Sequence, residues 1–231
     1  MIYITGDTHG DFKRIASFCD FTKSSKEDIL VILGDAGINY FNNKAEYERK
    51  IILNKLPVTL FCIHGNHEMR PESIDSYKEI KWNGGTVYAQ AEFPSILFAK
   101  DGEIYELDGK RCIAAGGAYS VDKFYRLVNN WSWFADEQPS DEIKKRVEER
   151  LDAENWQVDI VFSHTCPFKY IPREAFTMGI NQYSVDNSTE IWLDDIENKL
   201  SYKQWYCGHY HINKTIDKLR FLYGDFYMMQ D

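Results

Sequence analysis

The sequence predicts an α/β fold whose first half alternates buried strands with helices. Apolar runs rich in β-branched residues cover 2–5, 29–33 and 58–63, and apolar residues recur at helical spacing between them. This alternation is typical of parallel sheets, because a parallel connection needs a crossover long enough to hold a helix. With 231 residues and 44% hydrophobic composition, the chain can bury one sizeable core, so we expect a single domain over residues 1–231.

Two helices are expected between these strands. The first follows Asp11, a residue type that caps helices, and its apolar positions run from Phe12 to Cys19. The second covers about 44–55 and ends before Pro57, which separates it from the third strand. This arrangement gathers the carboxyl ends of the strands at one edge of the sheet.

The second half changes to short strand-like segments separated by Gly, Pro and Asp, a pattern typical of antiparallel strands. The segments of this series are 86–88, 96–99, 104–107 and 111–115, and later strands are expected at 158–162, 205–207 and 220–223. A helix is expected after Ser140, and another contains Trp192.

Two long segments, 118–139 and 165–188, show no regular periodicity. Loops of this length inside a compact domain are more often lids or binding elements than plain connections. We therefore expect both segments to border an active site. Trp131, Trp133 and Phe134 favour packing that anchors the first segment, with stacking on a nucleobase as the alternative.

The composition narrows the classes of function. A formal net charge of −9 argues against long nucleic acid or an anionic membrane as partner, since both call for a basic surface. The chain begins without a signal-peptide pattern and has no long apolar span, so we expect a cytoplasmic protein. Its five cysteines form no C-x-x-C pair, so neither a disulfide framework nor a thiolate zinc site is expected. Cys166 lies two residues beyond His164, but no local signature supports a nucleophilic role.

Polar side chains follow the predicted strands in turns that contain Gly or Ser. These side chains are Asp7, His9, Asp35, Asn66, His67, His164, His209 and His211. Carboxylates, an amide and imidazoles are ligands for hard or borderline cations, and turns at one sheet edge can bring them together. The pattern therefore predicts a shared metal centre. His64, the remaining histidine, is expected behind the ligands or at the surface.

These residues lie in five ordered motifs. The motifs are Gly6-Asp-Thr-His9, Gly34-Asp35, Gly65-Asn-His-Glu68, Ser163-His164 and Gly208-His-Tyr-His211. Their order and spacing resemble those of the calcineurin-like metallophosphoesterases over nearly the whole chain. The resemblance implies a four-layer αββα sandwich with two mixed β-sheets, the metallo-dependent phosphatase fold. It also implies a phosphoesterase that hydrolyses a phosphate monoester or small diester.

The same resemblance implies two divalent cations and assigns their ligands. Asp7, His9 and His211 would hold one cation, and Asn66, His164 and His209 the other, with Asp35 bridging both. A shared carboxylate offsets the repulsion between cations about 3.5 to 4 Å apart. Nitrogen and oxygen ligands without thiolate suit Mn²⁺, our first expectation, and also Fe, Zn²⁺, Ni²⁺ or Mg²⁺.

The expected catalytic residues are His67 and Asp35. A hydroxide bridging the two cations attacks phosphorus in line, and Asp35 takes part by bridging the same cations. His67 stays off the cations and, as imidazolium, donates a proton to the departing oxygen. The alternative for His67 is a structural role in shaping its turn.

The sequence departs from the protein-phosphatase branch after the second motif, because 34–39 lacks the Arg that normally follows the Asp there. Candidates for the missing phosphate-binding charge are Arg70, Lys123, Arg126 and Arg173, with a solvated surface role as the alternative for each. The expected partner is a phosphorylated small molecule or a phosphoprotein. A nuclease of the same superfamily and a non-catalytic scaffold of this fold stay open as alternatives, although no ligand position is lost.

Overall fold

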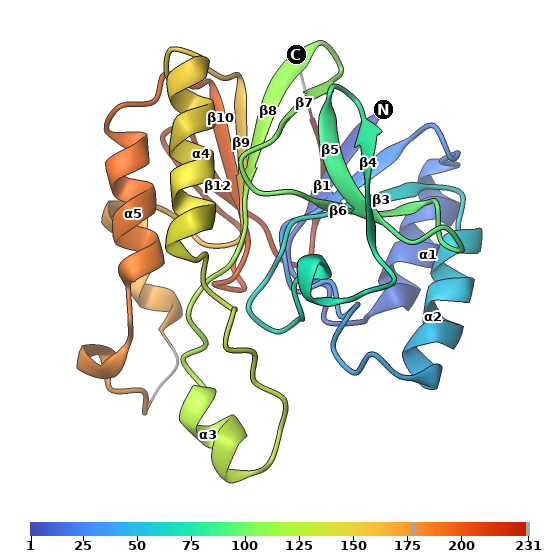
Figure 1. Ribbon diagram of the computed structural model, residues 1–231, viewed down its shortest axis with the longest axis horizontal. Helices are drawn as coiled ribbons and strands as arrows, with labels where there is room; N and C mark the ends of the chain where they lie inside the picture. The colour runs from blue at the N-terminus through green and yellow to red at the C-terminus, as the bar shows by residue number, and fades with distance from the viewer. Residues whose placement is uncertain (177–178, 230–231) are drawn as a thin grey trace.

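Two mixed β-sheets pack face to face in the computed structural model, which describes residues 1–176 and 179–229 (Figure 1). Helices α1 (Phe12–Thr22) and α2 (Lys44–Lys55) cover the outer face of one sheet. Helices α4 (Asp141–Ala153) and α5 (Ser188–Glu197) cover the outer face of the other. The layers are therefore helices, sheet, sheet and helices, and the predicted αββα sandwich of two mixed sheets is confirmed.

The first sheet has seven strands in the order β13-β1-β2-β3-β6-β5-β4. Its central strands are parallel, namely β1 (Ile2–Thr5), β2 (Ile29–Ile32), β3 (Thr59–Cys62) and β6 (Ile96–Ala99). The flanking strands run antiparallel to their neighbours, namely β13 (Phe226–Met228), β5 (Gly85–Ala89) and β4 (Lys78–Trp82). The parallel centre agrees with the strand–helix alternation predicted for the first half of the chain.

The second sheet has six strands in the order β11-β12-β10-β9-β8-β7. Its parallel strands are β12 (Leu219–Phe221), β10 (Gln204–Cys207), β9 (Ile160–Ser163) and β8 (Lys110–Ala115). Its antiparallel edges are β11 (Lys214–Ile216) and β7 (Ile104–Leu107). The chain thus begins in one sheet, builds the other, and returns to the first with β13.

The apolar strands are covered on both faces. In β1, Ile4 packs between the two sheets, whereas Tyr3 points to α1 and contacts Phe18 with ring centroids 4.9 Å apart. A strand covered on both faces has no polar side, which is why β1 and β2 read as continuous apolar runs. On the second sheet, the fully buried Trp205 belongs to the same apolar cluster as Val147 of α4.

Side-chain caps fix the starts of three helices. Asp11 accepts a hydrogen bond from the Arg14 N–H at 3.2 Å, as its position before the first helix predicted. Asn43 and Ser140 cap α2 and α4 in the same way. A cap of this kind contributes about 1 kcal/mol to helix stability and helps to set where each helix begins.

Three strands and one helix were not predicted. Strands β4, β11 and β13 lie at sheet edges, where partly exposed sequences lack a continuous apolar run. Helix α3 (Lys123–Val128) interrupts the predicted loop 118–139. Segment 165–188 contains three 3₁₀ turns, and its residues 177 and 178 lie outside the described residues. Both segments are therefore more regular than the sequence indicated.

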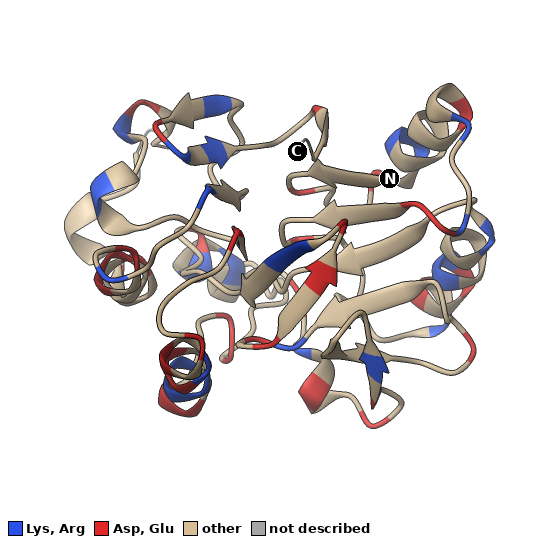
Figure 2. Cartoon of the chain, turned by 90° about the horizontal axis from the view of Figure 1, so that it is seen from above, with Lys and Arg blue, Asp and Glu red and all other residues tan. Residues whose placement is uncertain are grey.

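Charged side chains of both signs are interspersed over the helices and surface hairpins, while most of the central strands carry none (Figure 2). Within residues 1–176 and 179–229, no helix is both long enough and apolar enough to cross a membrane. All five cysteines are buried as free thiols.

Candidate metal centre

Five turns bring their polar side chains to one end of the sandwich. They follow β1, β2, β3, β9 and β10, as the sequence predicted. Four of the predicted ligands adopt left-handed backbone conformations, with φ of 46° at His9, 47° at Asp35, 65° at His209 and 52° at His211. Such conformations are unfavourable for residues with a Cβ and concentrate at functional sites. The backbone is therefore shaped to aim these side chains.

The motif glycines permit the close approach of these turns. A Cβ on Gly65 would lie 2.1 Å from Oδ1 of Asp35, and a Cβ on Gly34 would lie 2.1 Å from Nδ1 of His164. Gly34 also has a φ of 95°, which L side chains rarely adopt. Larger residues at either position would push apart the side chains that the turns bring together.

The first group of donor atoms belongs to Asp7, His9 and His211. Nε2 of His211 lies 3.2 Å from Oδ2 of Asp7, and Nε2 of His9 lies 3.7 Å from the same oxygen. The two Nε2 atoms are 2.9 Å apart. Oδ2 of Asp7 is buried and accepts no well-aligned hydrogen bond within the described residues. A cation among these three atoms would satisfy that carboxylate oxygen, so the donor set fits a metal ion.

The second group belongs to Asn66, His164 and His209. Oδ1 of Asn66 lies 2.7 Å from Nε2 of His164 and 3.1 Å from Nδ1 of His209. Nδ1 of His164 lies 2.7 Å from the Leu33 carbonyl oxygen, to which it donates, so Nε2 keeps its lone pair for a cation. Ser120 fixes the amide, because its Oγ accepts a hydrogen bond from Nδ2 of Asn66 at 2.8 Å.

Asp35 lies between the two groups. Its Oδ2 is 3.9 Å from Nδ1 of His9 and 3.8 Å from Nε2 of His164. Its Oδ1 accepts the backbone N–H of His67 at 2.8 Å, which holds the carboxylate in place. The structure thus brings together all seven predicted ligands, and their assignment to two cations stays a prediction.

The electrostatics of the site suit cation binding. Burial would raise the pKa of Asp7, but the imidazoles around it, foremost that of His211, hold the pKa well below its ordinary value. Burial, aided by repulsion from His164, lowers the pKa of His209 to about 3. Contact with Asp7 raises the pKa of His211 despite burial. The ionised Asp7 carboxylate and the neutral His209 imidazole are in the state that binds a metal, whereas His211 would release its proton when it binds a cation.

His67 lies beside the predicted ligands and contacts the first long segment. Its Nε2 is 3.3 Å from Nη2 of Arg126 and 4.0 Å from Oδ1 of Asp122. Asp122 in turn accepts a hydrogen bond from Nε of Arg126 at 2.7 Å. Burial lowers the pKa of His67, Arg126 lowers it further, and Asp35 and Asp122 act in the opposite direction. The net effect is a pKa of His67 below its ordinary value.

The other three predicted phosphate-binding cations lie elsewhere. Arg70 is buried and pairs with Asp101 at 2.7 Å, so it serves the core and not the site. Nζ of Lys123 lies 4.0 Å from the centroid of the Trp133 ring. Arg173 is exposed and does not line the pocket beside the site. Of the four candidates, Arg126 is the one that contacts the predicted catalytic residue His67.

His64 and the loop aromatics can also be placed. His64 is buried, so the surface position left open by the sequence is wrong. Trp133 donates its indole N–H to Glu137 at 2.8 Å, and Phe134 packs edge-on against Tyr40. These contacts anchor the segment, which agrees with the favoured structural role. Trp131 is exposed and packs edge-on against Tyr125, its neighbour in the same segment.

A pocket of about 370 Å³ lies against the predicted ligands. The metal-centre turns supply one wall, and both long segments supply the rest, including Tyr119 and Val121 from the first and Phe176 and Ile180 from the second. The expectation that both segments border the site is in accord with this lining. The pocket is therefore polar at the turns and largely apolar beneath the segments.

Glu190, Ser120 and Asp122 are site residues that sequence reasoning missed. Glu190 lines the pocket and is buried, and its Oε1 accepts a hydrogen bond from Thr165 at 2.7 Å. Burial raises its pKa to about 7. In the sequence, Glu190 stands in the first turn of a helix, where exposed acids are common. Ser120 and Asp122 carried no signal beyond their position in a predicted loop.

The fold and this cluster of nitrogen and oxygen donors define a hydrolase of the metal-dependent phosphoesterase class. The chain belongs to the calcineurin-like phosphoesterase family, whose family model matches residues 1–213. No curated protein matches the sequence at a significant level.

Similar solved structures come from three organisms. The protein of unknown function AQ665 from Aquifex aeolicus is 21% identical over 71% of this chain and 80% of that chain, with a TM-score of 0.34. TT1561 of Thermus thermophilus is 11% identical over 90% of this chain and 80% of that chain, with a TM-score of 0.48. The phosphopantetheinyl hydrolase of Mycobacterium tuberculosis is 14% identical over 96% of this chain and 87% of that chain, with a TM-score of 0.46.

Proposed function

We propose that this protein hydrolyses a phosphate monoester or small diester with two divalent cations, Mn²⁺ foremost. One cation would be held by Asp7, His9 and His211, the other by Asn66, His164 and His209, with Asp35 between them. The observation that carries the proposal is the chain of donor atoms from His211 through His9, Asp35 and His164 to Asn66. Nε2 of His9 lies 2.9 Å from Nε2 of His211, and Nδ1 of the same ring lies 3.9 Å from Oδ2 of Asp35. That Oδ2 lies 3.8 Å from Nε2 of His164, which lies 2.7 Å from Oδ1 of Asn66.

The residues around this chain of atoms have separate proposed roles. When bound, the two cations supply Lewis-acid activation of water and neutralise charge on the phosphoryl oxygens. Arg126 binds a phosphoryl oxygen through its guanidinium, in place of the arginine missing after the second motif. A negative phosphoryl group beside His67 favours the imidazolium form, because an opposite charge raises the pKa of an imidazole. His67 then donates a proton to the departing oxygen.

The pocket favours a small substrate over a phosphoprotein. Its volume of about 370 Å³ is at the low end of the range for small-molecule sites. Apolar residues from the second long segment, among them Phe176 and Ile180, line the same pocket as His67. A leaving group with an apolar part fits this lining.

A metal-by-substrate panel tests the proposal. Purified protein is freed of metal, supplied with one cation at a time, and assayed on phosphopeptides, nucleotides, cyclic nucleotides and bis-p-nitrophenyl phosphate. We expect hydrolysis of small esters that depends on the added cation and is lost in Asp35→Asn. Cleavage of single-stranded DNA as the main activity would identify a nuclease instead. Cation binding without hydrolysis of any ester would indicate a scaffold.

A further inference from the structure

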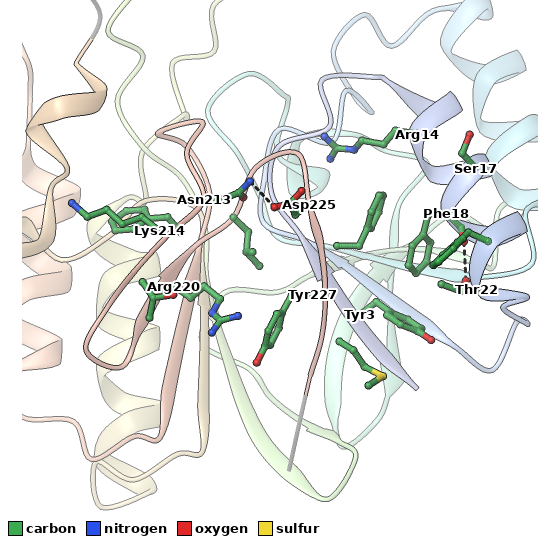
Figure 3. Close-up of a pocket in the computed structure, with 16 residues that line it drawn as sticks. Tyr3, Arg14, Ser17, Phe18, Thr22, Asn213, Lys214, Arg220, Asp225 and Tyr227 are labelled. Atoms are coloured by element: carbon green, nitrogen blue, oxygen red, sulfur yellow. Dashed lines mark hydrogen bonds between the residues drawn. The ribbon is translucent and has the colours of Figure 1, made fainter.

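A second and larger cavity lies along one side of the sandwich. Its volume is about 1010 Å³, and it shares no lining residue with the pocket beside the metal centre. Figure 3 shows β13 running between α1 on one side and the β11–β12 hairpin on the other, and these three elements supply most of the lining. The cavity, here called the edge groove, therefore follows the edge of the first sheet.

The strand at the floor of the edge groove has an open edge. β13 ends the first sheet and pairs with β1 alone. Tyr3 pairs with Met228, and the N–H of Met229 donates to the Ile2 carbonyl at 2.9 Å. Because alternate residues of an antiparallel strand face the partner, the N–H and C=O groups of Phe226 and Met228 point away from β1. These groups are the template to which a further strand can add.

The α1 side of the edge groove carries one buried and one exposed aromatic side chain, Phe18 and Phe21. Phe18 stacks on Phe226 with ring centroids 4.3 Å apart and forms a flat apolar wall. Phe21, one turn further along α1, has an exposed fraction of 88%, and Met228 is 45% exposed. Exposed apolar side chains gathered beside an open strand edge are typical of a protein-binding surface.

The hairpin side of the edge groove carries Arg220, a cation with a ring contact but no ion pair among the described residues. The guanidinium of Arg220 lies 3.9 Å from the centroid of the Tyr227 ring. Figure 3 shows the two side chains next to each other. Its Nε is buried and has no hydrogen-bond partner within the described residues. The Nε of Arg14, at the α1 end of the groove, is unpartnered in the same sense. A carboxylate entering the groove would pair with the Arg220 guanidinium, whereas Nη2 of Arg14 already donates to the Thr5 hydroxyl and to the Gly6 and Asp7 carbonyl oxygens.

We propose that the edge groove binds an extended, acidic peptide segment of a partner protein, which adds as a strand to β13. Successive side chains of an added strand point to opposite faces, so apolar residues of the peptide lie against Phe18 and Phe21 and acidic residues lie toward Arg220. A second copy of this chain fits less well. Its β13 offers Phe226, Tyr227 and Met228, none of which carries a carboxylate, and the preceding Asp225 already accepts a hydrogen bond from Asn213 at 2.9 Å.

The probe is the fluorescein-labelled heptapeptide Ser-Glu-Leu-Glu-Val-Glu-Ser, titrated with the full chain and followed by fluorescence anisotropy. Two control peptides are used. In the lysine peptide, each Glu is replaced by Lys. In the N-methylated peptide, alternate residues carry N-methyl groups, which removes the N–H donors along one edge of the extended peptide. We expect the acidic peptide to bind at least about tenfold more tightly than the lysine peptide, since charge complementarity selects partners. N-methylation on the pairing edge should abolish binding.

Two substitutions locate the binding. Met228→Pro removes one outward N–H and should weaken binding, and Arg220→Glu should reverse the preference between the acidic and lysine peptides. Lys145→Glu on α4 is the control with the same change of charge, and circular dichroism melting shows that each variant is folded. Equal binding of both peptides, or binding unaffected by the two substitutions, would overturn the proposal. Self-association of the chain that Met228→Pro abolishes, measured by sedimentation, would assign the groove to a second copy instead.

Discussion

Replacing Glu190 with Gln should make the free energy of unfolding less dependent on pH. In the folded protein, burial raises the pKa of this carboxyl group from its ordinary 4.5 to about 7. Between these values the folded state keeps a proton that the unfolded state has lost. The free energy of unfolding therefore falls as the pH rises through this window. The amide introduced by the substitution would stay neutral throughout and could still accept the hydrogen bond from Thr165.

The shift fixes the size of the expected effect. One unit of pKa corresponds to about 1.4 kcal/mol, so the difference between 4.5 and about 7 amounts to about 3 kcal/mol at full ionisation. Glu190 is 3% exposed, so solvent screening of the buried carboxylate is small. The variant and the natural protein should be equally stable near pH 4. At pH 8 the variant should be more stable by about 3 kcal/mol.

Urea unfolding of the metal-free protein at several pH values measures this difference. The control is Glu197→Gln on the same helix. Burial acts to raise the pKa of Glu197, but hydrogen bonds from Lys169 and Tyr202 outweigh it and hold the pKa below its ordinary value. That substitution should therefore destabilise the protein at neutral pH and lose its effect under acidic conditions. Parallel stability profiles for the natural protein and Glu190→Gln between pH 4 and 8 would refute the reasoning.

Three further predictions concern the metal centre. His67→Ala should lower the rate of hydrolysis of an alkyl phosphate more than that of a phenyl phosphate, because the alkoxide is the poorer leaving group and needs the proton more. Equal losses on both substrates in steady-state assays would count against the acid role of His67. Arg126→Ala should reduce kcat/KM on small phosphate esters by about 10- to 100-fold, the size expected for a lost charge-assisted hydrogen bond, and an unchanged value would remove Arg126 from substrate binding. Mn²⁺ at about 100 times its Kd should raise the free energy of unfolding of the natural protein by about 2.7 kcal/mol. Thermal melting should show a much smaller stabilisation by Mn²⁺ in Asp35→Asn. Equal stabilisation of both proteins would place the cation elsewhere.

Burial on both faces explains why so much of the fold could be predicted. Strands β1 and β2 carry no polar side, so the apolar runs that end at Gly6 and Gly34 mark them in the sequence. The edge strands gave no such signal. β4 has mostly exposed residues, and β13 has three residues whose pairing with β1 joins positions more than 200 apart. Tertiary contacts decide whether such a segment becomes a strand.

In the candidate site, too, features set by neighbouring residues could be predicted from the sequence, whereas features set by distant contacts could not. The motif turns could be found because glycine and the ligand residues stand together in the sequence. The role of Arg70 could not, since its partner Asp101 stands 31 positions away. Glu190 was missed for a related reason, because its hydrogen-bond partner Thr165 stands 25 positions away in the sequence.

The two halves of the candidate centre differ in how firmly the fold holds them. His164 is fully buried and donates to the Leu33 carbonyl, and Asn66 is fixed by Ser120, so the fold sets the direction of both ligands before any cation arrives. The side chains of His9 and His211 are 37% and 45% exposed, and each has a left-handed backbone. Each of these conformations costs about 1 kcal/mol, which a bound cation would offset through its ligand bonds. His164 and Asn66 are thus part of the folded core, whereas the exposed His9 and His211 would gain the most stabilisation from a bound cation.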